Sequence, residues 1–186
     1  MPRRMALVVI ALCFLLTSGC AAKSSSPVSG DTTGDDASFE ATVGAAASLS
    51  PPPPPPPMLS RPETAAYSYL LWISHAYIRR DSNVASSTFD PFEDVRVDAY
   101  IQHNNEENRI LRQEPTAFDV KSVVAKENTA TVSAFESWRY RYIDAETGAY
   151  SSPTYVVSYD STYTLVKEAR GWVVHQVEAQ PRGEIK

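Results

Sequence analysis

The stretch VVAKENTATVSAFESWRYRYIDAETG, residues 123–148, decides the fold of this chain. Its polar Lys126-Glu127-Asn128 triplet predicts a turn, and residues 129–143 then alternate apolar and polar side chains. Such alternation is typical of a strand with one buried face. Residues 144–152 contain the Thr147-Gly148 pair and predict a loop. The stretch therefore predicts a long strand flanked by two chain reversals, as at the centre of an antiparallel sheet.

Three further strands are expected around this one. Residues 118–125 precede the turn, and residues 154–166 alternate with aromatic side chains on one face. A turn at residues 168–171 leads to a last strand over residues 172–179. If Tyr140 pairs with Tyr155 in the central hairpin, Glu136 lies opposite Tyr159. We therefore expect a four-stranded antiparallel meander.

Two helices are expected before the sheet. Ser60-Arg61-Pro62-Glu63 has the pattern of a capping box with proline at the first helical position, and predicts a helix over residues 62–80. Asp90-Pro91-Phe92-Glu93 repeats this signal, and the second helical region should run to about Gln113, before Glu114-Pro115. The fold class is thus α+β, with N-terminal helices packed on a curved four-stranded sheet in one domain, residues 60–186.

The N-terminus has the pattern of a bacterial lipoprotein signal peptide, residues 1–19. Arg3 and Arg4 precede the apolar residues 5–16, and Leu16-Thr17-Ser18-Gly19-Cys20 resembles the site at which a cysteine becomes the lipidated N-terminus. Thr17 departs from the usual leucine. The alternative is an ordinary secretory signal in which Cys20 has no role. Lipidated with palmitate or similar chains, Cys20 would hold the protein at the cell membrane, with the domain on the extracytoplasmic side of the cell envelope.

Cleavage at Cys20 also changes the composition of the chain. Cys13 would be lost with the signal peptide, so no thiol would remain for a disulfide, a metal or catalysis. Loss of Arg3 and Arg4 leaves 15 basic against 22 acidic residues, and the formal net charge moves from −5 to −7. This acidic excess argues against nucleic acid as a partner.

Residues 20–59 are expected to form a disordered linker. They are rich in Ser, Ala and Pro and contain few large apolar side chains, so they cannot bury enough surface to offset the entropy of ordering. Residues 51–57 are an unbroken proline run, which favours a stiff polyproline helix. The run is either a spacer or a docking site for a proline-binding module.

The strand pattern resembles the cone-shaped nuclear-transport-factor-2-like superfamily. The resemblance lies in residues 123–148, in VSYDSTYTLVK (residues 157–167) and in GWVVHQVEA (residues 171–179). Within the superfamily it is similar to the intermembrane-space domain of plastid-division proteins and its bacterial lipoprotein relatives. The resemblance implies a pocket on the concave face of the sheet and a possible homodimer through the sheet. It brings no set of catalytic residues.

The candidate chemistry is limited to one group of residues. The three histidines lack metal-ligand spacing and the domain has no glycine-rich loop, so no metal or cofactor is expected. Glu136 lies in alternation with Trp138, and beside Tyr159 and Tyr163 it could act as a base in a cone pocket. The alternative is a structural hydrogen bond between Glu136 and Tyr159 or Tyr163. Glu136→Gln is expected to cause no loss of stability, and a large loss would mark Glu136 as part of a structural network.

Two functions follow from these patterns. The first is a non-catalytic module at the cell envelope that binds a partner protein or a small apolar ligand. The second is a small acid–base enzyme, similar to an isomerase or dehydratase, that uses Glu136 and Tyr159. An open apolar cavity around Glu136 would favour the enzyme, whereas a cone filled by its own side chains would argue against it.

Overall fold

The computed structural model describes residue 39 and residues 41–182 of this chain of 186 residues. The predicted signal peptide, Cys20 and residues 20–38 lie outside the described part. Within that part, no helix is both long enough and apolar enough to cross a bilayer.

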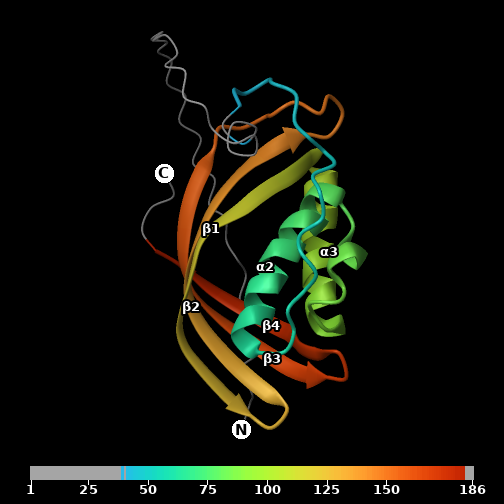
Figure 1. The fold of residues 1–186 in the computed structure, drawn as a ribbon. Helices are drawn as coiled ribbons and strands as arrows, with labels where there is room; N and C mark the ends of the chain where they lie inside the picture. Colours follow the sequence, from blue (N-terminus) through green and yellow to red (C-terminus); the bar gives the residue numbers. More distant parts are fainter. Residues whose placement is uncertain (1–38, 40, 183–186) are drawn as a thin grey trace, which may run out of the picture. The chain divides into compact units, whose positions relative to one another are not determined.

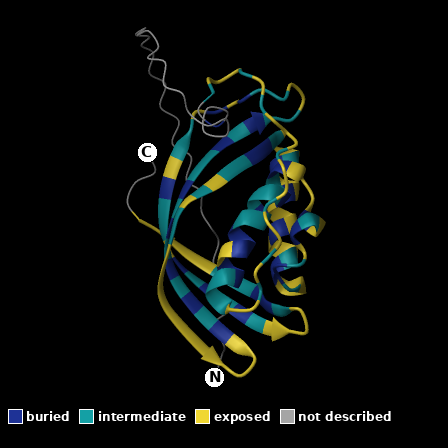
Figure 2. Cartoon of the chain, viewed as in Figure 1, coloured by how far each residue is buried: buried dark blue, intermediate teal, exposed yellow. Residues whose placement is uncertain are grey.

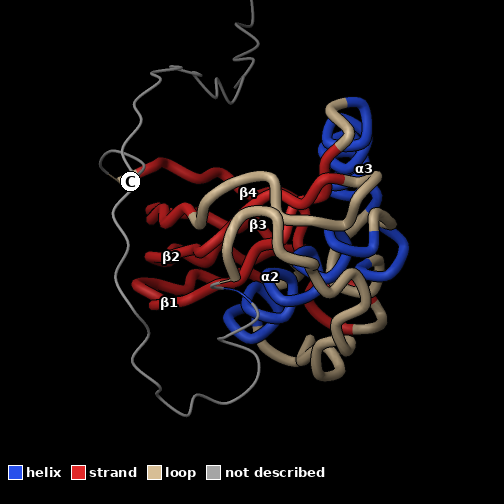
Figure 3. The backbone as a smooth tube through the Cα atoms, turned by 90° about the horizontal axis from the view of Figure 1, so that it is seen from above, coloured by secondary structure: helices blue, strands red, loops and turns tan. Residues whose placement is uncertain are grey.

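The domain contains two helices followed by a four-stranded sheet (Figure 1). The helical part comprises α2 (Pro62–Arg79), the short 3₁₀ helix η1 (Ser82–Ala85) and α3 (Pro91–Glu106). The strands are β1 (Arg109–Lys126), β2 (Thr129–Asp144), β3 (Tyr155–Glu168) and β4 (Gly171–Pro181), all antiparallel to their neighbours in the order β1-β2-β3-β4. Both helices lie within the curve of the sheet (Figures 1 and 3), so the expected α+β fold is confirmed.

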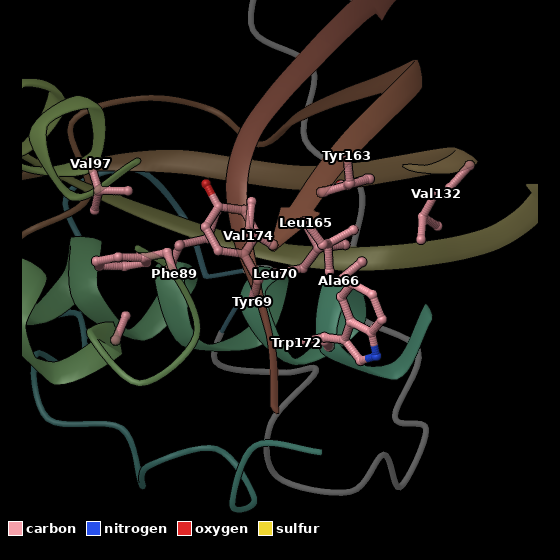
Figure 4. Packing of buried hydrophobic residues seen from close by; sticks show 14 of the residues in the cluster. Ala66, Tyr69, Leu70, Phe89, Val97, Val132, Tyr163, Leu165, Trp172 and Val174 are labelled. Carbon is pink, nitrogen blue, oxygen red and sulfur yellow. The ribbon is translucent and has the colours of Figure 1, made fainter. Parts of the chain in front are cut away.

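The central hairpin has the register in which Glu136 lies opposite Tyr159. Tyr140 pairs with Tyr155 and Glu136 with Tyr159. The even-numbered residues of β2 from Ala130 to Trp138 are all buried. They pack with α2 and β3 in the main core, where Tyr69 and Leu70 of α2 lie near Leu165 and Val174 (Figure 4). This face of the sheet is therefore filled by helix side chains.

The second helix is shorter than predicted. α3 ends at Glu106, and β1 begins at Arg109 after Asn108, whose φ of 52° turns the chain. Residues 110 and 111, expected in the helix, are buried in β1 instead. Pro115 does not end a helix but lies in β1 at a register shift, which an edge strand tolerates because proline lacks a backbone N–H.

Only one of the two predicted helix caps forms. Asp90 accepts hydrogen bonds from the backbone N–H groups of Phe92 (3.0 Å) and Glu93 (3.2 Å), as expected. At α2, the residue before the helix is Arg61, whose side chain makes no capping hydrogen bond, so the cap predicted at Ser60 is wrong.

The prediction of a disordered linker up to Leu59 is wrong for residues 41–59, which we call the strap. Its first half pairs with the loop after β2: the N–H of Gly44 donates to the Tyr150 carbonyl (2.8 Å), and the N–H of Ala47 to the Gly148 carbonyl (2.9 Å). Alanines of the strap pack on a second, smaller core of Ile78, Ile110, Ile143 and Tyr150. Small side chains thus suffice for docking, because their backbone groups also pair with the domain.

Arg141 holds the start of this segment in place. The alternation of β2 places Arg139 and Arg141 opposite Trp138 and Tyr140, and this pattern predicts a solvated stripe with acids such as Asp160. Arg141 is instead only 1% exposed and donates to the carbonyls of Phe39 (2.8 Å), Ala41 and Ser152 (3.1 Å). Arg139 pairs with Glu114 at 2.9 Å, and Asp160 pairs with Arg182. The expectation failed for Arg141 because the strap covers the outer face of β2 at that point.

Candidate functional site

Glu136 lies inside the domain, with both carboxylate oxygens occupied. Its side chain is 3% exposed, and the hydroxyls of Ser161 and Tyr163 each donate to one of its oxygens at 2.5 Å. Ser161 and Tyr163 project from β3, two and four residues beyond the register partner Tyr159. The structure therefore brings Glu136 and Tyr163 into direct contact, whereas the hydroxyl on the other oxygen is that of Ser161.

A second buried carboxylate lies on the helical side of the same core. The Tyr69 hydroxyl donates to Glu93 at 2.6 Å, and Arg96 pairs with the other Glu93 oxygen at 2.9 Å. The rings of Tyr69 and Tyr163 meet edge to face, with centroids 6.3 Å apart. Two carboxylate–phenol pairs are thus joined through aromatic contact across the interior.

Glu93 was missed as a buried residue because its position fits a capping box. The box is not closed, because the N–H of Asp90, which Glu93 would bind, donates to the Val174 carbonyl at 3.0 Å. Glu93 turns inward to Tyr69 instead. No local signal in the sequence separates these two arrangements.

Burial governs the protonation of this network. Desolvation and the nearby Glu136 raise the pKa of Tyr163 and the pKa of Tyr159. Desolvation likewise raises the pKa of Glu93, more than the Tyr69 hydrogen bond and Arg96 lower it. Both tyrosines are therefore neutral at physiological pH, and Tyr163 donates its proton to the hydrogen bond with Glu136. The surrounding space is taken by side chains such as Trp138, Val157 and Leu165, all buried in the same cluster.

A hollow that sequence reasoning missed lies beside this core, between the first turns of α2 and the middle of β1. Its volume is about 350 Å³. Its walls are Glu63, Thr64 and Tyr67 from α2, and Pro115, Thr116, Ala117, Phe118 and Val120 from β1. We call it the α2–β1 groove. The register shifts at Pro115/Ala117 and Val120/Ser122 shape its β1 wall.

The groove adjoins the buried network through one residue. Phe118 contacts Tyr67 across the groove, with ring centroids 5.6 Å apart, and meets Tyr163 edge to face at 5.9 Å. Beyond it, the last eight residues of β1 are all exposed, with Val123 and Val124 among them (Figure 2). The sequence signal that could have revealed the groove, Glu114-Pro115, was interpreted as the end of a helix.

The predicted absence of a metal site remains a prediction for the chain as a whole. Within the described residues, no group of three or more His, Cys, Asp or Glu side chains is arranged to hold a metal ion. His175 pairs with Asp90 at 2.6 Å and stacks on Phe92, with centroids 4.7 Å apart.

Comparison with known proteins concerns the fold alone. No protein-family model and no curated protein matches the chain. Among solved structures, the intermembrane space region of the chloroplast protein ARC6 is similar over 64% of this chain and 94% of its own, with a TM-score of 0.55 and 14% identity. The domain shares the fold of that region.

Two further solved structures are similar to this chain at lower TM-scores. An NTF-2 like protein of unknown function from Shewanella oneidensis has a TM-score of 0.41 and 16% identity, over 64% of this chain and 98% of its own. A ketosteroid isomerase-like protein from Erwinia carotovora atroseptica has a TM-score of 0.42 and 18% identity, over 66% of this chain and 95% of its own. The resemblance to an intermembrane-space domain, stated from the sequence, is confirmed at the level of the fold by the ARC6 structure.

The pocket expected on the concave face of the sheet is filled around Glu136 by the protein's own side chains. The polar network there is satisfied within the protein, and the accessible hollow lies at the edge of the sheet, next to β1. A buried and fully hydrogen-bonded carboxylate such as Glu136 fixes the packing of the core around it. The α2–β1 groove, in contrast, is open to contact with another molecule.

Proposed function

We propose that this chain is an envelope lipoprotein, anchored to the membrane through lipidated Cys20, whose domain is a non-catalytic protein-interaction module on the extracytoplasmic side. The signal pattern around Cys20 supports the anchor. The buried interior of the domain supports a non-catalytic module.

The observation that carries the proposal is the enclosure of Glu136. A general base must reach the proton that it removes, directly or through one water molecule. Glu136 is buried, both of its oxygens accept hydrogen bonds, and Trp138 and Leu165 pack in the same cluster. The alternative function, an acid–base enzyme with Glu136 and Tyr159 in a cone pocket, draws its support from the contact of Glu136 with the Tyr163 phenol in an apolar interior.

The α2–β1 groove is the surface that we assign to the partner, and we commit to an extended segment of another protein as its occupant. β1 is an edge strand, so the backbone groups on the side away from β2 suit pairing with a further extended chain. Tyr67, Phe118 and Val120 offer apolar contact for alternate side chains of such a segment. A small apolar ligand could contact these side chains but could not form the row of hydrogen bonds with the β1 backbone.

Site-specific photocrosslinking tests this assignment. A photoreactive amino acid replaces Val120 in the groove or, as a control, Val156, which is 50% exposed on β3. Crosslinking is carried out in intact cells of the source organism. We expect one protein product at position 120 and none at position 156.

The crosslinked protein is then purified and titrated against the wild-type domain and Phe118→Ala. A loss of affinity of tenfold or more in Phe118→Ala supports the proposal. Equal crosslinking at both positions, or equal affinity of both domains, contradicts it. A small molecule that co-purifies with the wild-type domain and whose conversion stops in Glu136→Gln would support the enzyme instead.

A further inference from the structure

The proline run of the strap lies against the domain along one of its edges. Pro51, Pro54 and Pro57 are half-buried, whereas Pro52, Pro53, Pro55 and Pro56 are exposed. A burial period of three is the period of a polyproline helix, which has three residues per turn. The run is therefore stiff and extended, as the sequence predicts, but one edge of it is seated on the protein.

The surface beneath the run is the outer face of α2 (Figure 1). The Trp72 indole N–H donates to the Pro55 carbonyl at 3.0 Å. On either side, the N–H of Met58 donates to the Ser68 hydroxyl at 2.9 Å, and Arg79 donates to the Ser50 hydroxyl at 3.3 Å. The run thus crosses α2 in the opposite chain direction, and each contact falls one to two helical turns from the next.

This arrangement has the chemistry of proline-rich peptide recognition. A polyproline helix makes no internal hydrogen bonds, so its carbonyls remain available to an outside donor. Proline-binding modules hold such segments in grooves lined by aromatic side chains. Binding is favoured further because the preformed helix loses little entropy. Trp72, with His75 packed edge to face against it at 6.0 Å, supplies this donor and this aromatic surface.

We propose that the outer face of α2, formed by Ser68, Trp72, His75 and Arg79, is a polyproline-binding surface that the chain occupies with its own proline run. The same surface binds a polyproline segment of another molecule when this run is released. The chain's own proline run lies on this surface, and it therefore shows that the occupant is a polyproline segment. This surface is distinct from the α2–β1 groove, whose α2 residues are Glu63, Thr64 and Tyr67.

Occupation by the chain's own run controls access to the surface. The run is joined to α2 through residues 58–61, and so short a connection holds it at an effective concentration in the millimolar range. A free peptide of the same sequence therefore competes poorly in the intact chain. It should bind well only after the run is displaced.

Titration with a fluorescently labelled peptide of residues 50–59, SPPPPPPPML, tests the proposal. The full chain is compared with Pro54→Glu, which places a charge on the seated edge, and with Pro53→Glu, which places the same charge on the exposed side. We expect at least tenfold tighter binding to Pro54→Glu than to the wild type and to Pro53→Glu. Adding Trp72→Ala to Pro54→Glu should abolish binding, whereas adding Phe118→Ala should not affect it.

A second variant covers incomplete release of the run. The triple variant Pro51→Glu, Pro54→Glu, Pro57→Glu charges the whole seated edge. If neither this variant nor Pro54→Glu binds the peptide more tightly than the wild type, the proposal is overturned. Equal binding by Pro53→Glu and Pro54→Glu would also overturn it. The two proposals can fail separately, because Phe118 lines the groove and is not one of the four residues that form the outer face of α2.

Discussion

The hydroxyl of Tyr69 on α2 donates to the carboxylate of Glu93 on α3 at 2.6 Å, and both side chains are buried. This bond joins the two helices inside the sheet's curve. Arg96 binds the other oxygen of Glu93 and also donates to the Val177 carbonyl of β4 at 3.0 Å. One carboxylate thus connects three elements, and its charge state affects the stability of all three.

The stability of the domain should depend on pH through Glu93. Desolvation raises the pKa of Glu93 in the folded state above its ordinary value of 4.5. A carboxyl with a raised pKa favours folding in its protonated form, so its contribution is most favourable below pH 4.5 and declines as the pH rises through the folded-state pKa. Relative to Glu93→Gln, the wild type should therefore lose stability with rising pH. Urea unfolding of both proteins from pH 4 to 8 measures this difference, and a constant difference would contradict it.

Glu136→Gln should destabilise the domain, in contrast to what a pocket residue would do. A glutamine is neutral and has one accepting oxygen, so both hydroxyls that face Glu136 lose a charged acceptor and one of them faces an NH2 donor instead. The expected loss is about 1–3 kcal/mol in the free energy of unfolding. Glu114→Gln, at a surface ion pair with Arg139, is the matched control and should cost less than about 1 kcal/mol. Equal losses of unfolding free energy in the two variants would contradict a structural role for Glu136.

Gly171→Ala should displace the end of the strap. Gly171 has a φ of 119°, and a Cβ there would lie 2.4 Å from the carbonyl oxygen of Leu59. That oxygen also accepts the N–H of Trp172 at 2.8 Å, so it cannot move without losing a hydrogen bond. We expect a loss of roughly 3 kcal/mol, at the upper end of the cost of backbone strain, together with faster proteolysis within residues 41–59.

Gly148→Ala is the control for this effect. Gly148 also has a positive φ, of 68°, but a Cβ there would meet only the Leu49 side chain, at 3.9 Å. It should cost about 1–2 kcal/mol, the usual penalty for a left-handed backbone. A Gly171→Ala protein that is no less stable than Gly148→Ala would show that the contact with Leu59 is dispensable.

Cys20→Ala should release the protein from the membrane fraction. The proposed anchor is the lipid on Cys20, since several acyl chains contribute about 0.8 kcal/mol for each buried methylene. Metabolic labelling with a palmitate analogue, followed by fractionation, measures both lipidation and attachment. Cys13→Ala, within the predicted signal peptide, should retain both. Labelled, membrane-bound Cys20→Ala protein would contradict the assignment.

The sequence predicted those elements whose signals are local. Alternation in β2 and β3 located the sheet, whereas the pairing of Tyr140 with Tyr155 was a condition that the structure meets. Glu136 was found for the same reason. The start of β1 was missed because residues 110–113 have no alternation that separates a strand from a helix.

Long-range contacts were beyond the reach of such patterns. The strap docks through backbone hydrogen bonds and alanines, a composition that equally suits disorder. The side chain of Glu93 turns inward because the N–H of Asp90 is already used by Val174, which lies in the last strand. The α2–β1 groove depends on register shifts in β1 that no single segment encodes.

The docked strap sets how far from the lipid the domain can work. If Cys20 is anchored, 18 residues separate it from Phe39, which Arg141 binds, whereas 39 residues separate it from Ser60. At about 3.3–3.6 Å for each fully extended residue, the longest possible tether falls from roughly 135 Å to roughly 65 Å. In an anchored protein the docked strap would therefore keep Phe39 within that distance of the lipid, and release of the strap would double the reach of the domain.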